Sequence, residues 1–233
     1  MTRVIAVTNQ KGGVGKTTTA VNLAACLAEA EFDVLLIDMD PQANASAGLG
    51  LRGRDPRLTS YGVLGGAAGL REATVATPLE HFSLVPACPD LAGAVVELAH
   101  ADGNDYVLDY ALSGHVDAYD FVFIDCPPSL GVLTINALVA AREVLIPVQA
   151  EYYALEGLAA LLETIGLVQE HLNPELEILG VVVTMYDGRT RLGREVAAEV
   201  RQHLGEHVFE TVVPRNVRLS EAPSHGLPIS RYD

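Results

Sequence analysis

Cysteine is scarce in this sequence of 233 residues, which contains three copies. Cys26, Cys88 and Cys126 lie far apart and form no C-x-x-C pair. This spacing argues against a metal cluster, a redox dithiol and the disulfide framework of a secreted protein, and a reducing cytoplasm fits it best. Cys26 and Cys126 lie beside apolar positions, which predicts that both are small core residues.

Positive charge is also scarce, since 15 lysines and arginines stand against 30 aspartates and glutamates, giving a net charge of -15. Bulk nucleic acid and anionic membranes should repel such a molecule, so contact with any polyanion requires a local basic patch. The apolar stretch that follows Arg3 has only a few residues, too few for a signal peptide or a membrane span. We therefore expect a cytoplasmic protein that makes no membrane contact.

Hydrophobic residues make up 49% of the chain, enough for one substantial core, so we expect a single domain over residues 1–233. Short β-branched runs alternate with helical patterns, which predicts an α/β fold with a doubly wound, mostly parallel sheet flanked by helices. The expected strands are 3–8, 34–38, 82–86, 121–125, 144–148, 178–184 and 211–213. The expected helices are 17–30, 155–171 and 191–204, and the glycine-rich stretch 53–69 is expected to be a surface excursion without regular structure.

A glycine-rich stretch, "NQKGGVGKTT", follows the first expected strand and opens the first expected helix. Such a turn directs backbone N–H groups at a common centre next to a helix N-terminus, which favours a di- or triphosphate. The stretch matches the P-loop pattern G-x-x-x-x-G-K-[ST] except at its first position, where Gln10 stands. Lys16 would neutralise the outer phosphates and the Thr17 hydroxyl would ligate Mg²⁺; the alternative is a glycine-rich turn with solvated lysines. The predicted nucleotide-binding residues here are Lys11, Gly12, Gly13, Val14, Gly15, Lys16, Thr17 and Thr18.

Three aspartates lie at the ends of two other expected strands, in "VLLIDMDPQ" and "FVFIDCPPS". A single aspartate at such a place is most often a turn or N-cap residue. Three of them at the edge of a sheet that carries a phosphate loop fit a second role. A nucleotide-bound Mg²⁺ needs one or two carboxylates, and an attacking water needs an acceptor near the γ-phosphate. We assign Asp38 and Asp125 to the metal, and Asp40 to the nucleophile.

Four stretches of the sequence resemble the ParA/Soj chromosome-partitioning ATPases, of the deviant Walker A group that also includes MinD. They are Lys11 to Thr18, "DMDPQAN", "DCPPSLG" and "PRNVRLSEAPSHG", and the resemblance covers nearly the whole chain. It implies slow, partner-stimulated hydrolysis of ATP to ADP, with Lys11, Lys16 and Asp40 as catalytic residues. It also implies a homodimer on ATP binding, in which Lys11 reaches across to the phosphates of the other subunit. A lysine suits this role because its ammonium is a compact charge on a long stem.

The same resemblance implies nonspecific binding of double-stranded DNA by the ATP dimer, through Arg189 and Arg218, and a nucleoid-associated location. From the residues alone, these arginines read as solvated surface or salt bridges. The resemblance further assigns nucleobase contacts to Pro214 and Asn216, where the plainer interpretation is a turn after a strand. Tyr152 and Tyr153 are expected to pack in the protein or to line the dimer interface.

The partner implied by the resemblance is a ParB-type centromere-binding protein that stimulates hydrolysis through a basic peptide, which an acidic surface suits. Family members usually continue into another C-terminal helix after the stretch that ends here at Asp233, and the helix-turn-helix domain of some plasmid relatives is not expected before the first strand. The main alternative is a MinD-like cell-division ATPase, which needs an amphipathic membrane helix that is absent up to Asp233. Another alternative is an ATPase that carries an iron–sulfur cluster, which needs paired cysteines at the dimer interface; the spacing of the three cysteines in this chain does not supply them. A small-molecule kinase or ligase, and a nonenzymatic nucleotide-binding module, are the remaining alternatives.

Overall fold

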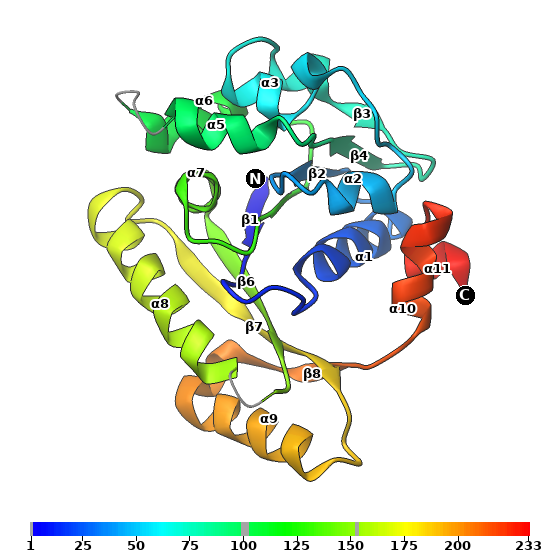
Figure 1. The fold of residues 1–233 in the computed structure, drawn as a ribbon, viewed down its shortest axis with the longest axis vertical. Helices are drawn as coiled ribbons and strands as arrows, with labels where there is room; N and C mark the ends of the chain where they lie inside the picture. The colour runs from blue at the N-terminus through cyan, green and yellow to red at the C-terminus, as the bar shows by residue number, and fades with distance from the viewer. Residues whose placement is uncertain (1, 99–102, 152–153) are drawn as a thin grey trace.

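Residues 2–98, 103–151 and 154–233 are described by the computed structural model of the protein, which is shown in Figure 1. Among them, an eight-stranded sheet runs through the molecule in the order β3-β4-β2-β5-β1-β6-β7-β8. All neighbouring strands pair in parallel except β3 and β4, which are antiparallel. The strands are β1 (Arg3–Val7), β2 (Val34–Asp38), β3 (Val75–Ala76), β4 (Phe82–Val85), β5 (Phe121–Asp125), β6 (Glu143–Gln149), β7 (Glu177–Tyr186) and β8 (Val208–Pro214).

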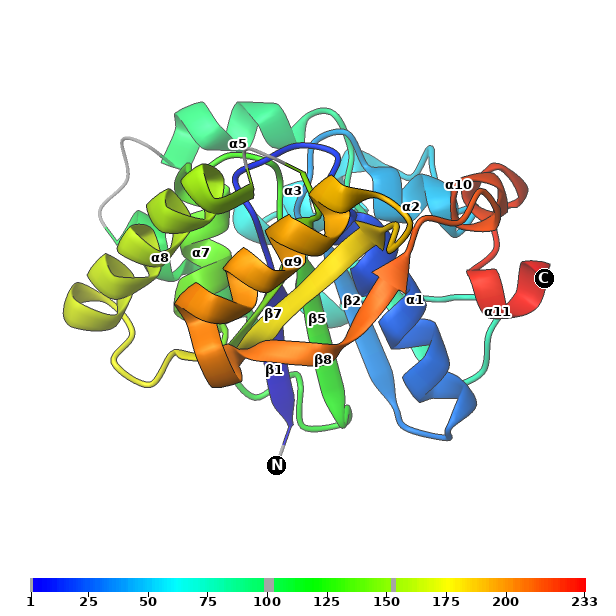
Figure 2. The ribbon, with the colours of Figure 1, turned by 90° about the horizontal axis from the view of Figure 1, so that it is seen from below.

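Helices connect the strands and cover both faces of the sheet (Figures 1 and 2). The α-helices are α1 (Lys16–Glu29), α2 (Asn44–Gly48), α3 (Ser60–Leu64), α4 (Leu70–Ala73), α5 (Leu91–Leu98), α6 (Val107–Leu112), α7 (Val132–Ala140), α8 (Ala154–His171), α9 (Arg191–Leu204), α10 (Arg218–Glu221) and α11 (Ile229–Tyr232). Short 3₁₀ turns are η1 (Pro56–Leu58), η2 (Asn104–Tyr106), η3 (Gly205–His207) and η4 (Ala222–His225).

Two hydrophobic clusters form the core, one on each face of the sheet, because successive side chains of a strand point to opposite faces. In β1, Val4 and Ala6 belong to the larger cluster, which includes residues of α7, α8 and α9. Ile5 and Val7 belong to the smaller one, which includes the buried alanines of α1. The expected α/β class with a mostly parallel, doubly wound sheet is therefore confirmed. No helix in the described part of the chain is both long and apolar enough to cross a membrane.

The glycine-rich stretch 53–69 corrects the sequence expectation, because it contains η1 and α3 and is partly buried. Thr59 and Ser60 are buried, and the Ser60 amide donates to the Pro86 carbonyl at 2.8 Å. Gly62 packs so closely on the backbone of Arg57 that a Cβ atom would overlap the Arg57 carbonyl oxygen. The glycines that suggested an irregular loop instead allow tight packing of one turn on another.

A second correction concerns the cysteines. Cys126 is buried as expected, but Cys26 is exposed on α1. The helix buries Ala24, Ala25 and Ala28 against the sheet, and its period of 3.6 residues places position 26 on the opposite side. The roles expected of Tyr152 and Tyr153 fall outside the described residues.

Candidate nucleotide-binding site

The phosphate loop connects β1 to α1 and adopts backbone angles that only glycine tolerates easily. Gly13 and Gly15 have φ values of 75° and 90°, in the left-handed region. Thr184, near the carboxyl end of β7, fixes the loop: its Oγ1 donates to the Val14 carbonyl at 2.7 Å. The amides that follow therefore lie at the start of a 14-residue helix, where the helix dipole favours an anion.

Lys16, the first residue of α1, is buried and donates from Nζ to the Lys11 carbonyl at 3.0 Å. Burial lowers the pKa of Lys16, and the nearby carboxylate of Asp125 acts in the opposite direction. The ammonium therefore lies inside the loop, where an incoming phosphate oxygen would replace the carbonyl as its acceptor.

The Lys11 side chain forms an ion pair with Glu151 of the same chain. Its Nζ lies 3.1 Å from Glu151 Oε2, while its amide donates to Asn9 Oδ1 at 3.0 Å. The other oxygen of Glu151 accepts from Gln149 Nε2, which fixes the carboxylate. The structure thus supplies a same-chain partner for Lys11 that the sequence did not predict.

The register of the sheet brings the carboxylates together. Asp38 of β2 pairs directly with Asp125 of β5, and Asp125 pairs with Val7 of β1, the strand that enters the phosphate loop. Asp125 is fully buried, and neither of its carboxylate oxygens has a hydrogen-bond partner. Burial and the nearby Asp38 raise the pKa of Asp125 well above its ordinary value of 3.8, while the Thr17 side chain acts in the opposite direction.

Asp38 differs from Asp125 because its oxygens are already engaged. Oδ2 accepts from the amide and hydroxyl of Ser46 at 2.9 and 2.7 Å, and Oδ1 accepts from the Asp40 amide at 3.1 Å. Burial raises the pKa of Asp38 to about 6 despite these bonds. Asp38 thus fixes α2 and the Asp40 backbone, and its predicted metal role stays a prediction.

Magnesium fits the arrangement through Asp125 and Thr17, and not through an all-protein cage. The searched, described residues contain no group of three or more histidine, cysteine, aspartate or glutamate side chains suited to a metal. A buried carboxylate without hydrogen bonds, beside the first turn of α1, is the kind of ligand that a phosphate-bound Mg²⁺ needs. The assignments of Thr17 and Asp125 remain predictions that this geometry favours.

A cleft of about 740 Å³ opens above the phosphate loop. Its walls come from the loop, from the segment that follows β2, and from η4, and include Lys16, Thr17, Asp40, Arg52 and Ser224. A smaller cavity of about 190 Å³ lies beside it and is lined by Thr18, Pro214 and Asn216, among others. The structure therefore brings the phosphate loop, Asp40 and the two predicted base-contacting residues to adjoining cavities.

Three residues that line the cleft or the smaller cavity were missed by the sequence reasoning. Thr184 and Met185 lie at the end of β7, and Met185 lines both cavities with a positive φ of 51°. The rule that ligands gather at the carboxyl ends of parallel strands could have flagged both. Arg52 carries no sequence signal, because it lies between a short helix that was not predicted and the stretch 53–69 that was expected to be irregular.

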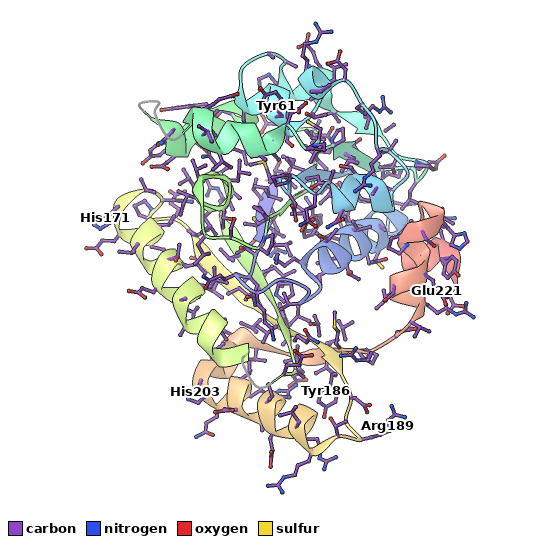
Figure 3. All side chains as sticks on the ribbon, viewed as in Figure 1. Tyr61, His171, Tyr186, Arg189, His203 and Glu221 are labelled. Carbon is purple, nitrogen blue, oxygen red and sulfur yellow. The ribbon has the colours of Figure 1, made fainter. Side chains whose placement is uncertain are left out.

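The two predicted DNA-binding arginines lie on different elements. Arg189 is on the loop before α9, while Arg218 opens α10 and bonds Glu221 at 3.1 Å; Figure 3 labels Arg189 and Glu221. Arg189 forms a two-bond pair with Asp187, at 2.9 and 2.8 Å. Both arginines therefore have acidic partners, and their DNA role stays a prediction.

A parallel α/β sheet with a glycine-rich loop, a lysine and a helix start at its first βα connection defines the P-loop class of nucleotide-binding proteins. A family model described as an AAA domain matches residues 2–178. The sporulation initiation inhibitor protein Soj of Bacillus subtilis is 54% identical over 233 residues, covering 100% of this chain and 92% of Soj. The chromosome partitioning protein ParA of Myxococcus xanthus is 53% identical, covering 99% and 82%. The chain belongs to the Soj/ParA family of chromosome-partitioning ATPases.

Solved structures agree with this fold. Cobyrinic acid a,c-diamide synthase from Mycobacterium smegmatis, with bound ADP and magnesium, superposes with a TM-score of 0.86 at 42% identity, covering 97% of this chain and 92% of that one. The septum site-determining protein MinD from Pyrococcus horikoshii, complexed with Mg-ADP, has a TM-score of 0.79 at 28% identity, covering 100% and 89%.

Proposed function

We propose that the chain, as one nucleotide-binding ATPase domain over residues 1–233, is a partition switch that binds Mg-ATP, dimerises, binds DNA and resets by slow hydrolysis. One observation carries this proposal: the phosphate loop, Lys16 and the unpartnered carboxylate of Asp125 converge at the carboxyl edge of the sheet. The cofactors are ATP or ADP with Mg²⁺, as in the neighbouring structure solved with ADP and magnesium.

Each residue of the site has a distinct task in this scheme. The amides of the loop and Lys16 hold the β- and γ-phosphates, and Thr17 and Asp125 would hold Mg²⁺. When bound, the metal ion would neutralise charge on the phosphates. Asp40 orients the attacking water and accepts its proton. Because an aspartate is a weak base at neutral pH, hydrolysis is slow until a partner accelerates it.

Dimerisation follows from the second lysine. In a sandwich of two subunits, Lys11 leaves Glu151 and contacts the phosphates held by the other copy. With ADP, the terminal phosphate and its share of that contact are missing, so the dimer loses its differential stabilisation. ATP therefore joins the subunits and hydrolysis separates them.

DNA binding is proposed for the dimer, through Arg189 and Arg218. Two copies of each arginine bind phosphates far better than one, with steep salt dependence, which reconciles DNA binding with an acidic chain. The proposed partner is a ParB-type protein that stimulates hydrolysis, and the proposed location is the cytoplasm, on the nucleoid.

Two other functions have weaker support. The diamide synthase structure is 42% identical and the MinD structure is 28% identical, whereas the two chromosome-partitioning relatives reach 54% and 53% over almost the whole chain. The identity therefore favours partition over a synthase or a MinD-like membrane cycle.

The test is DNA binding by the chain with ATP, ADP or no nucleotide at several salt concentrations. Lys11→Ala, Asp40→Ala and Arg218→Glu are measured alongside. We expect binding with ATP alone, a steep decline with salt, retention in Asp40→Ala and loss in the other two variants. A wild type that ignores DNA in every nucleotide state would contradict the proposal.

A further inference from the structure

The proposed nucleotide cleft holds little positive charge for a polyphosphate. Among the described residues that line it, two carry a positive charge, Lys16 and Arg52. Asp40 also lines it, and two further carboxylates, Asp38 and Asp125, lie buried next to it. Lys11 is held by Glu151. We propose that Arg52 is a second phosphate-binding cation, which contacts the terminal phosphate of the nucleotide in the same subunit. This inference rests on the proposed function and adds a residue that distinguishes ATP from ADP.

The fold brings Arg52 back to the start of the helix that it follows. After α2 the chain reverses: the Gly50 amide donates to Ala47 at 3.0 Å, and the Leu51 amide donates to Ser46 at 2.8 Å. Gly50 permits this turn with a φ of 70°, and Leu51 packs against the smaller core cluster. The backbone beside Arg52 is thus fixed at the wall of the cleft.

The guanidinium of Arg52 is held by the loop that carries Asp40. Its Nη2 donates to the Gln42 carbonyl at 2.9 Å, and in the described part of the chain it forms no ion pair with an acidic side chain. A guanidinium has five N–H donors in a planar fork, so most remain for a second acceptor. A phosphate oxygen is the acceptor that a cation at the mouth of this cleft would meet.

The anchor of Arg52 also links it to the proposed nucleophile position. Gln42, whose carbonyl accepts from Arg52, donates its amide to Asp40 Oδ1 at 2.9 Å. A terminal phosphate bound by Arg52 would therefore fix the segment from Asp40 to Gln42. Because ADP lacks this phosphate, the contact should raise affinity for ATP and leave affinity for ADP almost unchanged.

The experiment measures equilibrium binding of a non-hydrolysable ATP analogue and of ADP, each with Mg²⁺, by calorimetry. Arg52→Gln is compared with Arg54→Gln, the same exchange at an exposed residue that lines an adjoining groove and not this cleft. We expect Arg52→Gln to weaken analogue binding by about fivefold and ADP binding by less than about twofold. Arg54→Gln should bind both like the wild type. Arg52→Lys should be intermediate, because an ammonium keeps the charge but loses the planar fork.

Unchanged ADP binding by Arg52→Gln shows that the variant folds. If wild type and Arg52→Gln prefer the ATP analogue over ADP by the same factor, the assignment of Arg52 is overturned and the proposed function stays intact. Equal losses in Arg52→Gln and Arg54→Gln would also overturn it, by pointing to a general effect of charge. A wild type that binds neither nucleotide would overturn the proposed function together with this inference.

Discussion

Lys11 Nζ lies 3.1 Å from Glu151 Oε2 in the same chain, and the two side chains are 31% and 47% exposed. The lysine that we propose to act across a dimer is thus engaged within its own subunit. An ion pair this exposed contributes about 0.2 to 1 kcal/mol. It is weak enough to be exchanged for a contact with a triphosphate and strong enough to oppose dimerisation measurably.

Glu151→Gln should therefore favour the ATP-bound dimer. Removing the carboxylate charge frees Lys11 for the other subunit, which should lower the protein concentration needed for dimerisation by up to about fivefold. Sedimentation velocity with a non-hydrolysable ATP analogue measures this shift. Glu163→Gln, an exposed glutamate on α8, is the matched control and should behave like the wild type. Weaker dimerisation of Glu151→Gln would mean that Glu151 supports the dimer and does not restrain Lys11.

Asp125→Asn should stabilise the nucleotide-free protein while abolishing Mg-ATP binding. Burial and the neighbouring carboxylate of Asp38 outweigh the stabilising effect of the Thr17 side chain on the Asp125 charge, so that charge costs stability at neutral pH. Relief of even about 1 kcal/mol raises Tm by roughly 2 to 4 °C in a chain of this size. Thermal melts with and without Mg-ATP test both parts, and Asp117→Asn on the exposed surface is the control. A lower Tm for Asp125→Asn would show that the carboxylate is structural.

The same variant should change how stability depends on pH. The pKa of Asp125 is raised in the folded state above its ordinary value of 3.8. Unfolding therefore releases a proton between the two values, and wild-type stability declines as pH rises through that window. Asparagine does not titrate, so the Tm of the variant relative to that of the wild type should increase as pH is raised from 3.8 through the folded-state pKa of Asp125. A difference independent of pH would rule out ionisation of Asp125 as its cause.

Local sequence patterns predicted the framework of this molecule well. Strands β2 and β5 and helix α9 have the expected bounds. The two strands are continuous apolar runs that end at an aspartate, and the helix is long enough for its 3.6-residue period to be read. The phosphate loop was recognisable because its chemistry is contiguous: glycines, Lys16 and Thr17 follow one another along the chain.

The features that the sequence did not predict depend on residues far apart in the chain. The bonds from Lys11 to Glu151 and from Thr184 to the loop span 140 and 170 positions. The exposure of Cys26 depends on which side of α1 meets the sheet, and the buried hydroxyl of Thr59 lies 3.4 Å from Cys88 Sγ, 29 positions further along the chain. Such relations are fixed by tertiary packing, which propensity and motif do not encode.

Asp187→Asn should strengthen DNA binding by the ATP form. Arg189 is 91% exposed, and its two bonds to Asp187 hold the pKa of that carboxyl at about 2. Both side chains therefore stay ionised, and their opposite charges cancel. Without the carboxylate charge, Arg189 becomes available to a DNA phosphate. We expect affinity to rise about twofold to threefold, and the slope of log affinity against log salt to steepen by up to about one.

Glu199→Gln on α9 is the control for Asp187→Asn, because it removes one exposed negative charge away from the Arg189 loop. Its salt slope should match that of the wild type. Equal gains in both variants would indicate a general effect of net charge, and no gain in either would argue that Arg189 does not contact DNA.

Gly226→Ala should weaken nucleotide binding from outside the phosphate loop. Gly226 follows Pro223 and Ser224, which line the cleft, and a Cβ atom there would lie 3.3 Å from the Gly50 backbone. The methyl group should push this turn off the segment that follows α2 and widen the cleft, lowering ATP affinity by about threefold or more. Gly114→Ala is the matched control, because Gly114 has the same φ of 71° but no atom within 4 Å of the added carbon. Both variants should lose about 1 kcal/mol of stability to the left-handed backbone, but Gly226→Ala alone should lose affinity. Equal ATP affinity in the two variants, measured by calorimetry, would show that the C-terminal turn does not shape the nucleotide cleft.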